Sequence, residues 1–153
     1  MAQWVEVKVR YEKLSQEGKT IRVTEPYLVD TLSCTDAEAR VVKELTPYIS
    51  GEFNVIAVNK TQIADVLFNE AGDKFFKAKL VFIVINEKTG IKKRMPYFIL
   101  VEAPYFEEAY HRVADLCNNM VADCEIESIS ETKYIDAFKY EVADANPQQR
   151  DDV

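Results

Sequence analysis

The sequence contains few of the residues on which catalytic and metal sites depend. Its 153 residues include one histidine, His111, and three cysteines, none of them in a CxxC pair or near the histidine at a ligand spacing. No nucleophile beside a base, phosphate-binding glycine loop or ligand cluster is recognisable. The sequence therefore predicts a non-enzymatic protein with no metal or cofactor, and with reduced thiols that are mostly packed.

Long apolar runs are also missing. No stretch approaches the roughly 18 apolar residues that a membrane span needs. The N-terminal residues MAQWVEVKVR alternate between polar and apolar, which differs from the apolar core of a signal peptide. These two absences predict a cytoplasmic protein that does not associate with membranes.

An excess of positive charge is the third absence. The formal net charge is −7, which argues against binding duplex DNA by neutralising many phosphates at once. Local basic faces remain compatible with this balance. A hydrophobic content of 48% is typical of a folded globular chain.

The chain contains two copies of one pattern. Residues 75–139 repeat the order of features in residues 4–68, at an offset that drifts between about 70 and 72. Trp4 aligns with Phe75, Pro26-Tyr27 with Pro96-Tyr97, and the segment from Thr61 to Asp65 with the segment from Thr132 to Asp136. Each copy therefore reads as one β-β-α-β unit.

Periodicity gives the elements of each unit. Alternation predicts a strand over residues 4–13 and a return strand over 20–32, where Pro26 indicates an edge or a bulge. Thr35 and Glu38 form a capping-box pattern that predicts a helix start, and Pro47 and Gly51 predict its end. Further predicted strands cover residues 53–58, 76–85, 95–102, 124–129 and 134–138, with a second helix over 106–120. Residues 61–68 are predicted to continue the preceding strand, although a short helix there or around Thr132 stays possible.

The predicted fold is α+β. Tandem duplicated β-β-α-β units form a mixed or antiparallel sheet with two helices on one face, related by a pseudo-twofold axis. The run from Leu80 to Ile85 is apolar on both sides, which predicts a central strand. Residues 1–143 form one domain made of repeats 4–68 and 75–139, and residues 144–153 form a flexible acidic tail.

Several strings resemble a known family. WVEVKVRYEK, TEPYLVDTLSCTDAEARV and ISGEFNV, followed by ISET in the second copy, are similar to a family of small uncharacterised proteins of Bacteroidetes and their phages. The resemblance extends to about residue 138 and implies a bacterial or phage cytoplasmic protein. It implies no catalytic residue, because the family is a domain of unknown function.

The outer faces of the first strand of each copy carry the main candidate site. If Val5, Val7 and Val9 face the core, the opposite face presents an aromatic residue followed by spaced cations, which is what a platform for single-stranded nucleic acid requires. The tip of the second hairpin adds a basic finger. The predicted nucleic-acid-binding residues are Trp4, Lys8, Arg10, Phe75, Lys77, Lys79, Lys88, Lys92, Lys93 and Arg94. Trp4 and Phe75 would stack on bases, and the cations would contact phosphates.

Three other interpretations stay open. Lysine and arginine on a strand face also serve as an ordinary solvated surface. Trp4 and Phe75 would also suit a cap on the core or a dimer interface. Together with Tyr27 and Tyr97 they would suit the homodimer or phage-assembly interface of a protein-interaction or structural module. An enzyme ranks third and would use Asp65 and Asp136, if the two carboxylates met across the pseudo-twofold axis.

Overall fold

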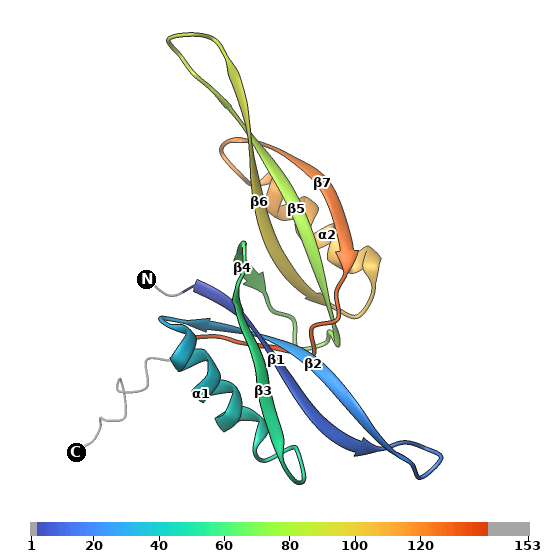
Figure 1. Ribbon diagram of the computed structural model, residues 1–153. Coiled ribbons are helices and arrows are strands. Elements are labelled where there is room, and N and C mark those ends of the chain that lie inside the picture. Colours follow the sequence, from blue (N-terminus) through green and yellow to red (C-terminus); the bar gives the residue numbers. More distant parts are fainter. Residues whose placement is uncertain (1–2, 141–153) are drawn as a thin grey trace, which may run out of the picture.

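The computed structural model describes residues 3–140, whose eight strands and two helices form two four-stranded sheets (Figure 1). Sheet A has the strand order β3-β1-β2-β8, and sheet B has the order β4-β6-β5-β7. The first copy supplies β1 (Gln3–Leu14), β2 (Thr20–Thr31), α1 (Cys34–Leu45), β3 (Phe53–Lys60) and β4 (Ile63–Leu67). The second copy supplies β5 (Lys74–Ile85), β6 (Lys92–Ala103), α2 (Phe106–Asn118), β7 (Asp123–Glu131) and β8 (Asp136–Phe138).

The α+β class, the duplication and the mixed strand pairing are confirmed, with the strands divided between two sheets. The registers define which residues are equivalent. Val7 pairs with Tyr27 in sheet A and Ala78 pairs with Ile99 in sheet B, so equivalent residues lie 71 positions apart in the first strands and 72 apart in the second. Even the bulge is repeated, after Lys8 in β1 and after Lys79 in β5.

These registers correct one predicted equivalence. Pro26 lies opposite Lys8, whereas Pro96 lies opposite Val81, two positions nearer the hairpin tip. Aligning the two Pro-Tyr dipeptides gives a smaller offset between the copies than the strand pairing gives for β2 and β6. Both prolines lie just beyond the residues that pair with β8 or β4, so the expectation of an edge position is confirmed.

The two copies exchange their last strands. β4 follows β3 in the chain but pairs in parallel with β6 of sheet B, and β8 pairs in parallel with β2 of sheet A. The segment after Thr61 is therefore a strand in the other sheet, and the prediction that it continues β3 is wrong. A threonine stands at each crossing: the Thr61 hydroxyl donates to the Trp4 carbonyl and the Thr132 hydroxyl to the Phe75 carbonyl, both at 2.8 Å.

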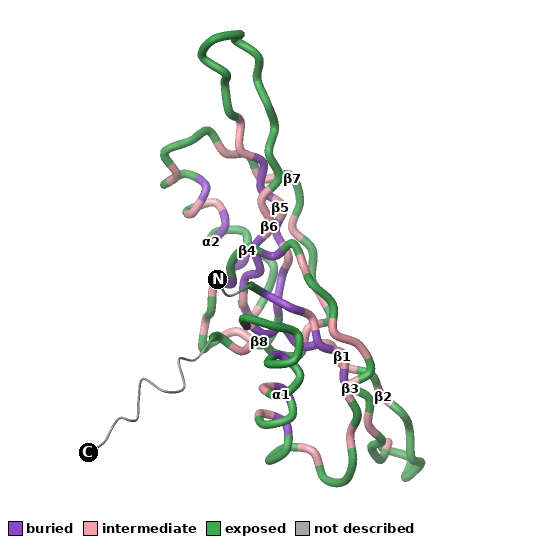
Figure 2. Tube along the Cα trace, turned by 60° about the vertical axis from the view of Figure 1, so that its left-hand side comes forward, coloured by how far each residue is buried: buried purple, intermediate pink, exposed green. Residues whose placement is uncertain are grey.

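Three clusters of buried side chains hold the body together. Figure 2 shows where the buried positions lie along the chain. α1 packs on sheet A through Ala37, Val41 and Leu45, and α2 packs on sheet B through Ala109 and Val113. The third cluster lies on the sheet faces away from the helices and joins the two sheets. Its members come from both copies: Trp4, Leu28, Ile63, Val66, Phe75, Leu100 and Ala137.

The start of α1 differs from the predicted capping box. Ser33 is the N-cap, and its hydroxyl accepts the Asp36 amide at 3.1 Å. Thr35 lies inside the first turn, so the pairing of Thr35 with Glu38 is wrong. Serine and threonine are similar caps, and two such residues stand two positions apart here, which is why the sequence pattern misplaced the boundary.

Each sheet extends into a hairpin arm beyond the packed body (Figures 1 and 2). In the β5–β6 arm, Val84, Ile85 and Ile91 are 45%, 52% and 65% exposed. β5 is central in sheet B as predicted, since it pairs with both β6 and β7, but its last residues lie in this arm. Gly72 closes the turn between the copies so tightly that a Cβ atom there would lie 2.7 Å from the Ala103 nitrogen.

Candidate functional site

The two aromatic residues of the predicted platform are buried. Trp4 is 5% exposed and Phe75 is 2% exposed, both in the cluster that joins the sheets. Neither ring is available to stack on a base, so this part of the predicted site is corrected. The sequence correctly placed them on the face opposite Val5, but that face is covered where the two sheets meet. The core-cap interpretation fits their position.

In sheet B, the predicted cations lie around a different aromatic ring. The Nζ atoms of Lys77 and Lys79 lie 4.9 and 5.9 Å from the centre of the Phe98 ring. Phe98 pairs with Lys79 across the β5–β6 ladder and is half-buried. Phe98 was not among the predicted residues, because it lies on a neighbouring strand, outside the alternation that selected Phe75.

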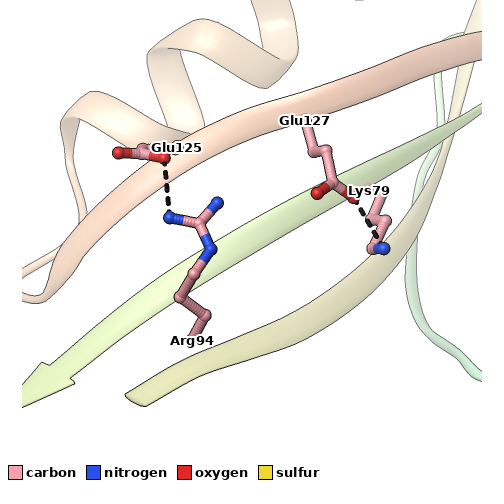
Figure 3. A network of polar contacts seen from close by, with 4 residues as sticks. All are labelled: Lys79, Arg94, Glu125 and Glu127. Atoms are coloured by element: carbon pink, nitrogen blue, oxygen red, sulfur yellow. Dashed lines mark hydrogen bonds and ion pairs between the residues drawn. The ribbon is translucent and has the colours of Figure 1, made fainter. Parts of the chain in front are cut away.

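Two carboxylates on β7 partner the cations of this face (Figure 3). Lys79 Nζ lies 2.6 Å from Glu127 Oε2, and Arg94 Nη1 lies 3.3 Å from Glu125 Oε1. The hydrogen bond from Lys79 lowers the pKa of Glu127, which keeps this carboxylate ionised. Two of the predicted phosphate-contacting cations are therefore already paired.

Sheet A lacks both of these carboxylates. The positions equivalent to Glu125 and Glu127 are Asn54 and Ile56 on β3, because Asn54 pairs with Arg10 as Glu125 pairs with Val81. Arg22 is equivalent to Arg94, because Arg22 pairs with Glu12 in sheet A and Arg94 pairs with Ile83, the residue equivalent to Glu12, in sheet B. The duplication thus supplies a neutral amide and an isoleucine where the other copy has two acids.

The open face of sheet A therefore carries cations that have no partners in the described part of the chain. Lys8, Arg10 and Arg22 form no ion pair or side-chain hydrogen bond within residues 3–140. Glu6, on the same face, accepts a hydrogen bond from the Tyr134 hydroxyl at 3.0 Å. Glu12 lies directly opposite Arg22 in the ladder, yet the two do not form an ion pair. Lys8 and Arg10 were predicted, whereas Arg22 and Asn54 were missed.

The predicted basic finger lies in the β5–β6 arm. Lys88, Lys92, Lys93 and Arg94 are all exposed there, close to the hairpin tip. β5 contributes Ile83, Val84 and Ile85 opposite the last three of these cations, so one strand of the arm is apolar and the other basic.

A notch opens beside the β1–β2 hairpin. It has a volume of about 700 Å³ and is lined by residues 10–14, 20, 22, 50–52 and 54. We call it the hairpin notch. It brings together Arg10, Tyr11, Arg22 and Asn54.

The tyrosines of the alternative interface are largely internal. Tyr27 is 4% exposed, stacks on Phe138 with ring centres 5.9 Å apart, and donates its hydroxyl to Glu25. Burial, followed by the charge of Glu25, raises its pKa. The Tyr97 ring packs on Phe82 at 5.2 Å.

The carboxylates of the enzyme interpretation lie in different sheets. Asp65 on β4 and Asp136 on β8 are equivalent, and each accepts the amide of the next residue at 2.8 Å. They line separate cavities of about 220 and 530 Å³. Within the described residues, no group of three or more histidine, cysteine, aspartate or glutamate side chains is placed to hold a metal ion.

Two features lie outside this site. The predicted acidic tail, residues 144–153, falls outside the described residues. In the part of the chain that is described, neither helix is long and apolar enough to cross a membrane.

Comparison with known proteins adds a family. No curated protein matches the chain. A protein-family model does match, over residues 3–140, which include every strand and helix described above. The chain therefore belongs to the family described as Domain of unknown function (DUF4494).

Proposed function

We propose that this is a non-enzymatic binding protein whose ligand is a single-stranded nucleic acid, bound by its phosphates on the open face of sheet A. One observation carries the proposal: Lys8, Arg10 and Arg22 have no carboxylate partners among the described residues, whereas Lys79 and Arg94, the equivalents of Lys8 and Arg22, are paired with Glu127 and Glu125. The proposed setting, from the sequence resemblance, is the cytoplasm of a Bacteroidetes bacterium or of one infected by a phage.

An extended and flexible polyanion suits this face better than duplex DNA. The cations follow two adjacent strands, and the net charge of −7 opposes a broad neutralisation of duplex phosphates. The basic β5–β6 arm supplies further exposed cations in Lys88, Lys92 and Lys93. Binding on these residues leaves Trp4 in its buried position, so its fluorescence is expected to stay unchanged.

A substitution that copies the second repeat tests the proposal. Asn54→Glu places beside Arg10 and Arg22 the kind of carboxylate that Glu125 offers Arg94. We expect about three- to tenfold weaker binding of a labelled single-stranded oligonucleotide, and a salt slope reduced by about one ion. Fluorescence anisotropy at several salt concentrations measures both.

Two further variants complete the test. Gln62→Glu adds the same charge at an exposed position between β3 and β4 and should leave affinity close to that of the unmodified protein. Glu125→Asn frees Arg94 and should tighten binding. Equal affinities for Asn54→Glu and Gln62→Glu would contradict a binding role for this face.

The second candidate function is a protein-interaction module. It is favoured by the exposed apolar residues of the β5–β6 arm, Val84, Ile85 and Ile91, which belong to none of the three core clusters. Salt-tolerant oligomers that are lost in Ile85→Ser and Ile91→Ser would favour this function. Oligonucleotide binding that survives both substitutions would favour the first.

A further inference from the structure

The hairpin notch exists because β3 does not cover the last residues of β1, its antiparallel neighbour. Phe53, the first residue of β3, pairs with Tyr11, and β1 continues to Leu14 without a strand on that side in residues 3–140. The step exposes both faces of β1. Arg10 and Tyr11, whose side chains leave a strand on opposite faces, therefore both line the notch.

The notch is suited to a phosphate group. Arg10, Lys13 and Arg22 bring three cations to it, against the carboxylates of Glu12 and Glu52. Arginine presents its donors as a planar fork that matches a pair of phosphate oxygens, which a lysine does not. Neither guanidinium has a partner in the described residues, so both are free to turn toward a ligand.

The notch is also larger than a phosphate needs. About 700 Å³ lies within the range of pockets that hold whole small ligands. Tyr11 is one of its lining residues, and its side chain is held in place by packing against the α1 core cluster. Burial and a hydrogen bond to Glu25 raise the pKa of Tyr11, so its phenol stays neutral beside an anion.

We infer that the hairpin notch holds one nucleotide unit of the bound strand, with its phosphate on Arg10 and Arg22 beside the Asn54 amide, and its base reaching Tyr11 across the step at the end of β3. An aromatic ring for stacking and a cation pair for the phosphate are the two components of single-strand recognition. This inference rests on the proposed function, and it identifies the chemical unit that the site selects.

The second copy shows why one unit per chain is expected. Its equivalent residues are Val81, Phe82, Arg94 and Glu125, in which one arginine is replaced by valine and the other is paired with a carboxylate. The Phe82 ring already packs on Tyr97. At these equivalent positions, the second copy thus has the same strands but a single arginine, whose charge is already balanced by Glu125.

Competition and NMR on the full chain test the inference. A nucleoside monophosphate should displace a labelled oligonucleotide at a concentration at least about tenfold lower than inorganic phosphate does. The same titration should shift the Asn54 side-chain amide and the Gly51 backbone amide. Tyr11→Leu should abolish the preference for the nucleotide, and Tyr11→Phe should retain it.

The outcomes separate the notch from the wider face. If the oligonucleotide binds but the two competitors are equivalent and Asn54 does not shift, the notch inference is overturned while the proposed function stands. If the oligonucleotide does not bind but the monophosphate shifts Asn54 and Gly51, the notch is a site for a free nucleotide, and both its place on a bound strand and the proposed function are overturned. Should Tyr11→Leu not fold, the NMR titration of the unmodified protein decides.

Discussion

Gly72 shows how a single residue fixes the junction between the two copies. A Cβ atom at this position would lie 2.7, 2.8 and 2.9 Å from the nitrogen, Cα and carbonyl carbon of Ala103. These are backbone atoms of a fully buried residue, so no flexible side chain can move away to relieve the overlap. The turn from β4 to β5 therefore depends on the missing side chain rather than on an unusual backbone angle.

We expect Gly72→Ala to lower the free energy of unfolding by about 1–3 kcal/mol, the usual effect of overpacking. Urea denaturation followed by circular dichroism measures it. Gly18→Asn is the control: Gly18 has a φ of +81°, which asparagine tolerates, and no atom lies within 4 Å of the added Cβ. A larger loss for Gly18→Asn than for Gly72→Ala would refute this explanation.

Individual residues also show where prediction from the sequence succeeds. The alternation around Val7 gives the strand and its two faces, because a period of two is a property of the local backbone. It gives no information on what covers each face. Trp4 looked like part of an open surface because the second sheet that buries it comes from residues about 70 positions away.

At the scale of elements, each helix holds the strand that arrives from the other copy. Arg112 on α2 donates through Nη1 to the carbonyls of Leu67 and Phe68 at the end of β4, at 3.4 and 3.1 Å. The equivalent Arg40 on α1 donates to the Lys139 carbonyl just after β8, at 2.8 Å. Short strands of five and three residues have few ladder bonds of their own, so these contacts secure their ends.

Arg112→Met tests this role. The substitution keeps an apolar stem but removes the donors, and we expect a loss of about 1–2 kcal/mol in unfolding free energy, with the amides of β4 exchanging faster than those of β5. Hydrogen exchange by NMR measures both effects. His111→Gln, at the exposed neighbouring position, should leave the β4 amides protected from exchange. Equally fast exchange of these amides in the two variants would show that Arg112 does not hold β4.

The crossing of β4 and β8 was the element that the sequence did not reveal. The segments 61–68 and 132–138 are recognisable as equivalent, and Ile63 and Val66 are apolar, but nothing local distinguishes a strand that continues one sheet from a strand that joins another. The neutral residue Asn54 could have been noticed in the sequence, because an offset of 71 aligns it with Glu125. The strand pairing shows that this is the offset that applies here.

At the scale of the whole molecule, the exchange places residues of both halves in one shared core cluster. The cluster that joins the sheets takes residues from β1, β2 and β4 of the first copy and from β5, β6 and β8 of the second. Removing either half would leave a sheet one strand short and expose Trp4 or Phe75. Neither copy can therefore unfold without disrupting the core of the other.

We expect Val113→Ala, in the core under α2, to lower the free energy of exchange at the Val7 amide as much as at Ala78, by about 2 kcal/mol. Native-state hydrogen exchange measures the two sites in one experiment. Val42→Ala is the control, since Val42 is 41% exposed. A change confined to Ala78 would mean that the halves unfold independently.

The position of β8 also has a consequence for biosynthesis. Sheet A is built from the first residues of the chain, but its fourth strand ends at Phe138, close to the last described residue. Domains usually fold as they leave the ribosome, starting from the N-terminus. Here the first half must wait with Trp4 and Leu28 uncovered until β8 has been synthesised, so the nascent chain presents an apolar surface to chaperones that the folded protein covers.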